Sequence, residues 1–303
     1  MRVTRRTLLA TAAASVAAGL VPRRLVAEMA LGDGTLTTVS DGHLVLPGDF
    51  LFAPMPQDAL MPLLAELDVS RDTLEPPCNV TLWRDAEATV LFDCGAGGEF
   101  MPSAGRLLEN LDAVGVAPED VTHIVFTHAH PDHIWGLLDD FGDPAFPDAQ
   151  LLMGATEHAY WTDPATVDTI GEARAAFAVG AARRLEMVAD RVALFNDGDE
   201  VLPGIAAVAS FGHTPGHMAF SLARGGTGAM VVGDAIGNGH VAFARPGWLS
   251  GADQDPEAAA ETRQALLSQL ADSGTPLVGF HLPGGGIGRA VPADGGYRFE
   301  VAS

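Results

Sequence analysis

Seven side chains that could bind metal ions follow short apolar runs in this sequence. They are His128, His130, Asp132, His133, His213, Asp234 and His281. Each apolar run is a predicted strand, and ligands in open α/β sheets collect outside the carboxyl ends of the strands. Five imidazoles and two carboxylates are enough for two metal ions that share one carboxylate. The sequence therefore predicts a metal site built for catalysis.

The first cluster, residues 128–133, reads His-Ala-His-Pro-Asp-His. In an extended segment alternate side chains share a face, so His128 and His130 should point the same way. Pro131 suits the first position of a helix, which places Asp132 and His133 in the first turn. The helix dipole there favours an ionised carboxylate and a neutral imidazole, the two states that bind metal. One such histidine alone would more often be a buried structural residue, so it is the complete set that indicates a metal site.

Four short motifs surround these candidate ligands. They are His-x-His-x-Asp-His at 128–133, Gly-His-Thr-Pro-Gly-His at 212–217, Gly-Asp-Ala at 233–235 and Phe-His at 280–281. Together they resemble the metallo-β-lactamase fold superfamily. The residues that flank the motifs most resemble the branch that holds methyl parathion hydrolase and the quorum-quenching lactonases. The resemblance runs from about Thr35 to Arg289. It implies an α/β fold, a four-layer αβ/βα sandwich in which two β-sheets pack face to face with helices outside.

The resemblance also divides the ligands between two metal ions. One metal would be bound by His128, His130 and His213. The other would be bound by Asp132, His133 and His281, and Asp234 would bridge both. Two further residues would support the ligands without binding metal, namely Asp93 and His217. The His-rich set suits Zn²⁺ best, and Mn²⁺, Fe²⁺ or Co²⁺ would fit the same ligands.

The expected reaction is hydrolysis by a hydroxide that bridges the two metals. Asp132 and Asp234 are the predicted catalytic carboxylates, and Asp234 would hold the metal separation. The expected substrates are uncharged, partly apolar esters, lactones or phosphotriesters. Asp234 counts against a true β-lactamase, because those members lack a bridging Asp at this position. Two alternatives stay open: a mononuclear-iron sulfur dioxygenase-type oxidoreductase, and a non-catalytic metal-binding protein.

Several aromatic residues lie just after the motifs or in the segments that connect them. Such residues usually lie in the hydrophobic core, but aromatic side chains also form lids over sites of this kind. A core position and a position in the pocket wall both stay open. The candidates for the pocket wall are Phe50, Phe52, Trp135, Tyr160, Trp161, Phe243 and Trp248.

The charge of the chain narrows the class of partner. There are 17 basic residues, all of them Arg, and 39 acidic ones, for a net charge of −22. Such a surface repels the phosphates of nucleic acid and of anionic lipid. We therefore expect a small-molecule substrate, no nucleic acid and no stable membrane association. Near the ligand segments only Arg245 and Arg289 could pair with an anion. Monomer and homodimer both remain open.

The N-terminus resembles a twin-arginine export signal. Arg5 and Arg6 precede a weakly apolar, Ala-rich stretch, and an Ala-x-Ala-like cleavage site ends near Ala27. About fourteen apolar residues are too few for a membrane-spanning helix, which needs ~20. We expect residues 1–27 to be a signal read by the twin-arginine export machinery, and residues 28–303 to be a single domain. The folded enzyme would then be periplasmic or secreted.

A coarse map places the remaining elements. We expect a strand at 35–39, a surface loop at 44–57, and helices at 59–67, 103–114, 160–187 and 255–271. Asp253 or Asp255 would cap the last of these helices. The two cysteines, Cys78 and Cys94, flank a hairpin with its turn near Ala86. An oxidising compartment allows a disulfide between them, but a shift of one residue in register would separate the side chains. Free buried thiols are slightly favoured, and neither cysteine is expected to bind metal.

Overall fold

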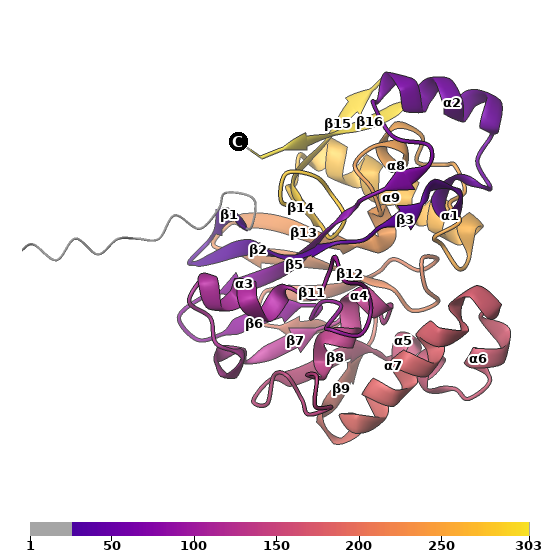
Figure 1. Cartoon of the computed structure of the whole chain (residues 1–303). Coiled ribbons are helices and arrows are strands. Elements are labelled where there is room, and N and C mark those ends of the chain that lie inside the picture. The colour runs from indigo at the N-terminus through magenta and orange to yellow at the C-terminus, as the bar shows by residue number, and fades with distance from the viewer. Residues whose placement is uncertain (1–25, 303) are drawn as a thin grey trace, which may run out of the picture.

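Two seven-stranded sheets face each other in the computed structural model, which describes residues 26–302 (Figure 1). The first sheet has the strand order β1-β2-β5-β6-β7-β8-β9. Its strands are β1 (Val26–Leu31), β2 (Gly34–His43), β5 (Pro77–Arg84), β6 (Thr89–Phe92), β7 (His123–Val125), β8 (Gln150–Gly154) and β9 (Val192–Phe195). The strands from β6 to β9 run parallel, and the others pair antiparallel.

The second sheet follows the chain order from β10 to β16. Its strands are β10 (Glu200–Leu202), β11 (Ile205–Ala209), β12 (Met218–Arg224), β13 (Thr227–Gly233), β14 (Leu277–Gly279), β15 (Ile287–Ala293) and β16 (Gly296–Val301). Only β13 and β14 pair in parallel, because the helix α9 (Pro256–Ser273) connects them. The predicted fold class, two sheets packed face to face with helices outside, is confirmed.

The core between the sheets is apolar and is built by alternate side chains of both sheets. The first sheet contributes Trp83 and Phe92, and the second contributes Phe220 and Val231. The Phe92 and Phe220 rings lie 5.3 Å apart, centroid to centroid. This packing fixes the two sheets against each other, and with them the edge where the ligand segments end.

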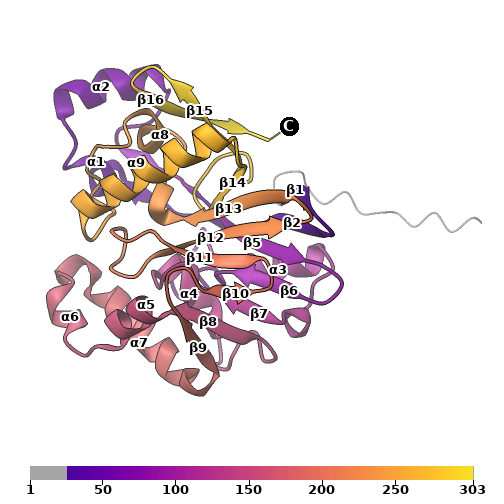
Figure 2. The same ribbon diagram turned by 180° about the vertical axis from the view of Figure 1, so that it is seen from behind.

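Helices cover the outer face of each sheet (Figure 2). The first sheet packs against α3 (Leu107–Ala113) and α7 (Ala175–Met187). The second packs against α9, whose Leu267 and Leu270 lie on Val232. Asp255 caps α9 by accepting a hydrogen bond from the Ala258 amide, so the predicted helix and cap are both found. The predicted helices at 59–67, 103–114 and 160–187 are present with shifted or divided bounds as α2 (Gln57–Glu66), α3, and α5 (Ala155–Thr162) to α7.

Two segments differ from the expectation. The stretch 44–57, expected as a surface loop, contains β3 (Leu46–Pro47) and α1 (Gly48–Phe52), and β3 pairs with β4 (Thr73–Leu74). Its apolar residues are buried against α2, which explains why the segment folds. The chain also enters the first sheet earlier than expected, because β1 pairs antiparallel with β2.

Both cysteines are free and buried, so the prediction of free thiols in place of a disulfide is confirmed. The hairpin pairs Thr81 with Phe92 and Arg84 with Thr89, one residue out of register with a turn centred on Ala86. Cys78 and Cys94 are therefore not directly opposite each other in the hairpin, although both are buried in the same core cluster of the first sheet. The predicted export signal lies outside the described residues, apart from the two that begin β1. Between residues 26 and 302, none of the helices has the length and apolar character needed to cross a bilayer.

Candidate metal centre

The ligand segments leave both sheets at one edge of the sandwich. Residues 128–133 follow β7 of the first sheet and run into the helix α4 (Pro131–Ile134), with Pro131 at its first position as predicted. His213, Asp234 and His281 follow β11, β13 and β14 of the second sheet. The ligands therefore do not share the rim of one sheet. The site forms where two packed sheets end side by side.

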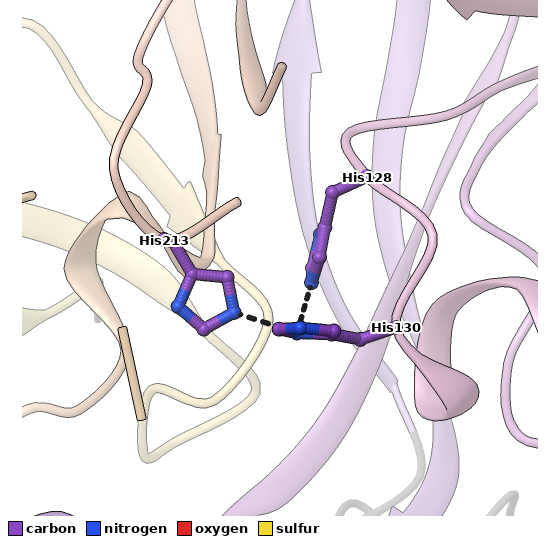
Figure 3. Close-up of side chains that lie close together, drawn as sticks. All are labelled: His128, His130 and His213. Carbon is purple, nitrogen blue, oxygen red and sulfur yellow. Dashed lines mark hydrogen bonds between the residues drawn. The ribbon is translucent and has the colours of Figure 1, made fainter. Parts of the chain in front are cut away.

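His128, His130 and His213 form one cluster, called here the three-histidine group. His130 Nδ1 lies 3.0 Å from His128 Nε2 and 2.9 Å from His213 Nε2. Figure 3 shows His128 and His130 projecting from one loop and His213 facing them from another. Three nitrogens on one tetrahedral zinc ion would stand about 3.3 Å apart, given Zn–N bonds of about 2.0 Å. The imidazoles therefore need to separate by only a few tenths of an ångström.

The outward nitrogens of this group are held by hydrogen bonds. His213 Nδ1 donates to Asp253 Oδ1 at 3.0 Å, and Arg263 in turn donates to Asp253 Oδ2 at 3.3 Å. His128 Nδ1 lies 3.0 Å from the Thr127 hydroxyl, which donates to Asp93 at 2.8 Å. Such partners fix the tautomer and the ring orientation of metal-binding histidines. The metal-facing atoms are thereby left as His128 Nε2 and His213 Nε2.

The other four ligands form what we call the mixed group: Asp132, His133, Asp234 and His281. Nε2 of His281 lies 3.2 Å from an oxygen of Asp132 and 3.2 Å from Oδ2 of Asp234. Nε2 of His133 lies 3.4 Å from Oδ1 of Asp234. Oδ2 of Asp234 also lies 3.4 Å from His213 Nε2. Asp234 thus contacts both groups, as a bridging carboxylate would.

Two contacts orient the histidines of the mixed group. His133 Nδ1 donates to Asp93 Oδ2 at 2.8 Å, and His281 Nδ1 donates to the Pro77 carbonyl at 2.8 Å. Asp93 is therefore placed as predicted, beside the ligand loop, and adopts a left-handed φ of 67°. It touches both groups, His133 directly and His128 through Thr127.

Buried polar atoms without hydrogen-bond partners indicate that these residues could hold a metal ion. Within the described chain, three buried atoms lack a hydrogen-bond partner at this point: Asp132 Oδ2, His133 Nε2 and Asp234 Oδ1. Buried polar atoms are seldom left unpaired, since each unpaired atom costs roughly 1–3 kcal/mol. All three face the centre of the mixed group. A cation there would satisfy them together.

Electrostatics separate the two groups. Burial lowers the pKa of His128 and of His130, and neighbouring imidazoles lower both further. Burial also opposes charge on His133 and His281, yet the carboxylates around them raise both pKa values well above the ordinary value.

The two carboxylates of the mixed group respond in the opposite direction. Burial alone would raise the pKa of Asp132 and of Asp234, but the His133 and His281 imidazoles hold both pKa values well below the usual range. His128 and His130 are therefore neutral, and the mixed group is a set of ion pairs.

His217 supports the bridging aspartate. Its Nε2 accepts a hydrogen bond from the Asp234 backbone amide at 3.0 Å, and its Nδ1 lies 2.8 Å from the Ser210 hydroxyl. Burial is the largest cause that lowers the pKa of His217 to about 3. A neutral ring is what this acceptor role requires. The structure thus places His217 next to the ligands, at the backbone of Asp234.

Cys78 lies nearer to the ligands than the sequence indicated. Its sulfur belongs to a cluster with Asp132 and His281, whose ligand atoms all lie within 4.8 Å of one another. The preceding residue, Pro77, accepts a hydrogen bond from His281 through its carbonyl, which places Cys78 beside that ligand. The expectation that neither cysteine binds metal stays a prediction. Burial raises the pKa of the Cys78 thiol to about 11, which favours the protonated form.

A cavity of about 520 Å³ opens beside the ligands. Two of the predicted pocket residues line it, Phe50 and Trp248. Its other large apolar walls come from segments on both sides of the ligands: Leu44, Leu46, Leu51, Met55, Leu67, Val69, Leu74, Phe100, Phe177 and Val241. Three arginines also reach it, namely Arg174, Arg245 and Arg263. Arg289, predicted as an anion partner, is exposed on β15 instead.

The other predicted pocket aromatics do not line the cavity. Phe52, Trp161 and Phe243 are fully buried in the core, and the Trp161 ring lies edge-on to the ligand His130, with 5.7 Å between the ring centroids. Trp135 stacks under the Arg184 guanidinium, 4.5 Å from the ring centroid. Tyr160 packs half-buried on the core of the first sheet.

Two acidic residues at the site were not recognised from sequence as part of it. Asp253 was considered only as a helix cap, and Glu157 was not singled out. Both are buried beside ligand loops, and Glu157 is only 1% exposed. Neither lies in a ligand motif, so the sequence offers no clear signal for either residue. Their role depends on packing between distant segments.

Comparison with known proteins identifies the family. The profile of the "Metallo-beta-lactamase superfamily" matches residues 74–281, most of the chain. The chain belongs to the metallo-β-lactamase superfamily. A mouse (Mus musculus) metallo-beta-lactamase domain-containing protein 1 is 53% identical over 49 residues, 16% of each chain. The uncharacterized protein YobT of Bacillus subtilis is 26% identical over 160 residues, 53% of this chain and 62% of that protein. The matched segments cover less than two thirds of either relative.

Solved structures of the superfamily have the same architecture. The dizinc quorum-quenching lactonase AidC, in complex with a product, aligns over 92% of this chain and 99% of its own, with TM-score 0.86 and 24% identity. The hydrolase AbOPH aligns over 92% and 97%, with TM-score 0.84 and 28% identity. The family and these neighbours support a metal-dependent hydrolase that uses divalent metal ions. The resemblance seen in the sequence motifs is thereby confirmed at the level of the superfamily.

Proposed function

We propose that this protein is a dinuclear metal-dependent hydrolase of uncharged, partly apolar esters, lactones or phosphotriesters. The observation that carries the proposal is the meeting of seven ligands from four segments at the mouth of an apolar cavity. The neighbouring lactonase and hydrolase structures agree with this reaction class.

The two ligand groups and Asp234 would have separate roles in binding the metal ions. Two divalent cations, when bound, supply Lewis acids and lower the pKa of water toward neutrality. The three-histidine group would hold one cation and the mixed group the other. Asp234, in contact with both groups, would fix their separation, and its ionised form is secured by the low pKa. Zn²⁺ is the proposed metal, and Mn²⁺, Fe²⁺ or Co²⁺ would suit the same ligands.

The cavity supports the uncharged substrate. Each of its arginines is already bonded to the protein: Arg174 to the Gly251 carbonyl at 2.7 Å, Arg263 to Asp253, and Arg245 to the Ala244 carbonyl. The walls are mainly apolar, and buried apolar surface contributes roughly 25 cal/mol per Å². Binding energy would therefore come from an apolar tail, with little from anion pairing.

A substrate panel tests the proposal. The kcat/KM values of the Zn²⁺-loaded protein are measured for an aryl ester, a medium-chain lactone and a neutral phosphotriester. They are compared with a bis-aryl phosphodiester and a cephalosporin, which carry negative charge. We expect clear preference for at least one neutral substrate. Preference for either anion, or no hydrolysis of any of them, would refute the assignment.

We also propose export in the folded state through the twin-arginine route to the periplasm or beyond. The support is the pair Arg5 and Arg6 before an Ala-rich stretch. Exchange of both for Lys keeps the charge but removes the feature that this route reads. The precursor should then stay in the cytoplasm. Normal periplasmic accumulation of this variant would contradict the route.

A further inference from the structure

A single buried carboxylate joins the two loops that carry the three-histidine group. Glu157 lies near the start of α5 and is 1% exposed. One of its oxygens accepts a hydrogen bond from the Ala129 amide at 2.9 Å. The other accepts from the Thr214 hydroxyl at 2.7 Å and from the Gly216 amide at 3.0 Å.

These donors to Glu157 lie beside the histidines of the three-histidine group in the sequence. Ala129 lies between His128 and His130, while Thr214 and Gly216 directly follow His213. Glu157 therefore holds one loop with each oxygen. Because β7 and β11 belong to different sheets, these hydrogen bonds join two loops that strand pairing does not join.

The loop after β11 also fits closely against α5. A Cβ added to Gly216 would stand 2.2 Å from the Glu157 backbone nitrogen, so only glycine allows this approach. Trp161, one turn along α5, donates to the same oxygen of Glu157 that holds Ala129, at 2.6 Å. The carboxylate has four donors and no freedom to turn. Burial raises its pKa, while each of these hydrogen bonds lowers it.

We propose that Glu157 is a positioning residue that sets the spacing of His128 and His130 relative to His213, and thereby the metal affinity of the three-histidine group. It touches no ligand side chain and no member of the mixed group. Its effect on metal binding should therefore be selective. The inference rests on the proposed function only in requiring that the three histidines hold a metal.

Glu157→Gln is the direct test. A carboxamide has one oxygen and one NH₂, so in either orientation one loop faces a donor in place of an acceptor. We expect the metal of the three-histidine group to bind roughly 10–100-fold more weakly, the usual loss when an outer partner of a ligand is removed. The mixed group should keep its affinity. Competition with a chromophoric chelator measures both affinities, and the visible spectrum of bound Co²⁺ shows which ligand set is filled.

Asp41→Asn is the matched control. Asp41 is also a buried carboxylate with three backbone donors, the amides of Ala96, Gly105 and Leu107, but it holds no ligand loop. This variant should lower thermal stability without changing the ratio of the two metal affinities. If Glu157→Gln leaves both affinities unchanged, or weakens both equally, the positioning role is refuted.

Thr214→Val decides the question if the Gln variant does not fold. It removes one of the four donors and leaves both backbone amides in place, so a smaller but still selective loss at the three-histidine group is expected. Unchanged affinity in this variant would overturn the proposal. Because no substrate is used, failure of this test is distinct from failure of the substrate panel. A wild-type protein that binds no metal would instead refute the proposed function.

Discussion

The two ligand groups lie side by side but are held in different ways. In the three-histidine group His128 and His130 are neutral, and hydrogen bonds to Asp253, Thr127 and Glu157 hold the rings and loops. The mixed group is a cluster of ion pairs, and its histidines would be charged before a metal enters. The first group depends on orientation. The second depends on charge balance.

The difference implies that the two metals should respond to different perturbations. Protons compete for the histidines of the mixed group but not for His128 and His130. Changes in loop spacing should affect mainly the three-histidine group. Asp234 contacts both groups directly, and Asp93 contacts His133 directly and His128 through Thr127, so each of them should affect both metals together.

Asp234→Ala should have the largest effect. It removes the carboxylate shared by both groups and leaves His133 and His281 with a single shared partner, Asp132. We expect loss of activity and of at least one of two metals per chain, with an affinity loss above the ~100-fold typical of outer partners. Elemental analysis and hydrolysis assays measure both. A variant with two metals and full activity would show that Asp234 is not the bridge, and a wild type that stays at one metal would contradict the dinuclear site.

A change of pH should have the second-largest effect, because the metal affinities of the two groups depend on pH differently. The raised pKa values of His133 and His281 mean that metal must displace protons there, so apparent affinity at the mixed group rises as pH rises. The gain is up to about tenfold per pH unit for each proton released. The lowered pKa values of His128 and His130 leave them neutral, so their group should show little change between pH 6 and 8. Metal titrations across this range, with proton release recorded, check the contrast. Equal slopes at both groups would remove it.

Asp93→Asn tests the link between the groups. Asp93 accepts from His133 and from Thr127, which in turn meets His128. We expect both metals to bind roughly 10–100-fold more weakly. Asp253→Asn is the comparison, because Asp253 contacts only His213 among the ligands and should weaken one metal. If the two variants give the same pattern of metal loss, the assignment of these supports is wrong.

His217→Gln should have the smallest effect. The ring accepts from the Asp234 amide, and its loss leaves a buried donor that costs roughly 1–3 kcal/mol of stability. Since the pKa of His217 is lowered to about 3, its protonation does not contribute to pH dependence near neutrality. We expect a lower melting temperature and a modest loss of activity with an unchanged pH profile. A shifted profile would mean that His217 exchanges protons during the reaction.

The sequence predicted the fold and the ligand segments because both are encoded locally. Strand ends, the Pro131 helix start and the spacing of His128 and His130 depend on neighbouring residues. Glu157 and Asp253 could not be placed in this way, because their partners lie 28 to 59 residues away and meet them only through packing. The helix within the stretch 44–57 was not predicted for the same reason, because its apolar residues become buried only when they pack against α2.

The ligands are divided almost evenly between the two sheets. His128, His130, Asp132 and His133 come from the first sheet, while His213, Asp234 and His281 come from the second. A bound cation would therefore act as a cross-link between the halves of the sandwich, in addition to their apolar core and the hydrogen bonds of Glu157. A ligand that binds only the native state adds about 4 kcal/mol to the free energy of unfolding at a thousand times its Kd. The resistance of this protein to heat and to proteolysis should thus follow the free metal concentration around it.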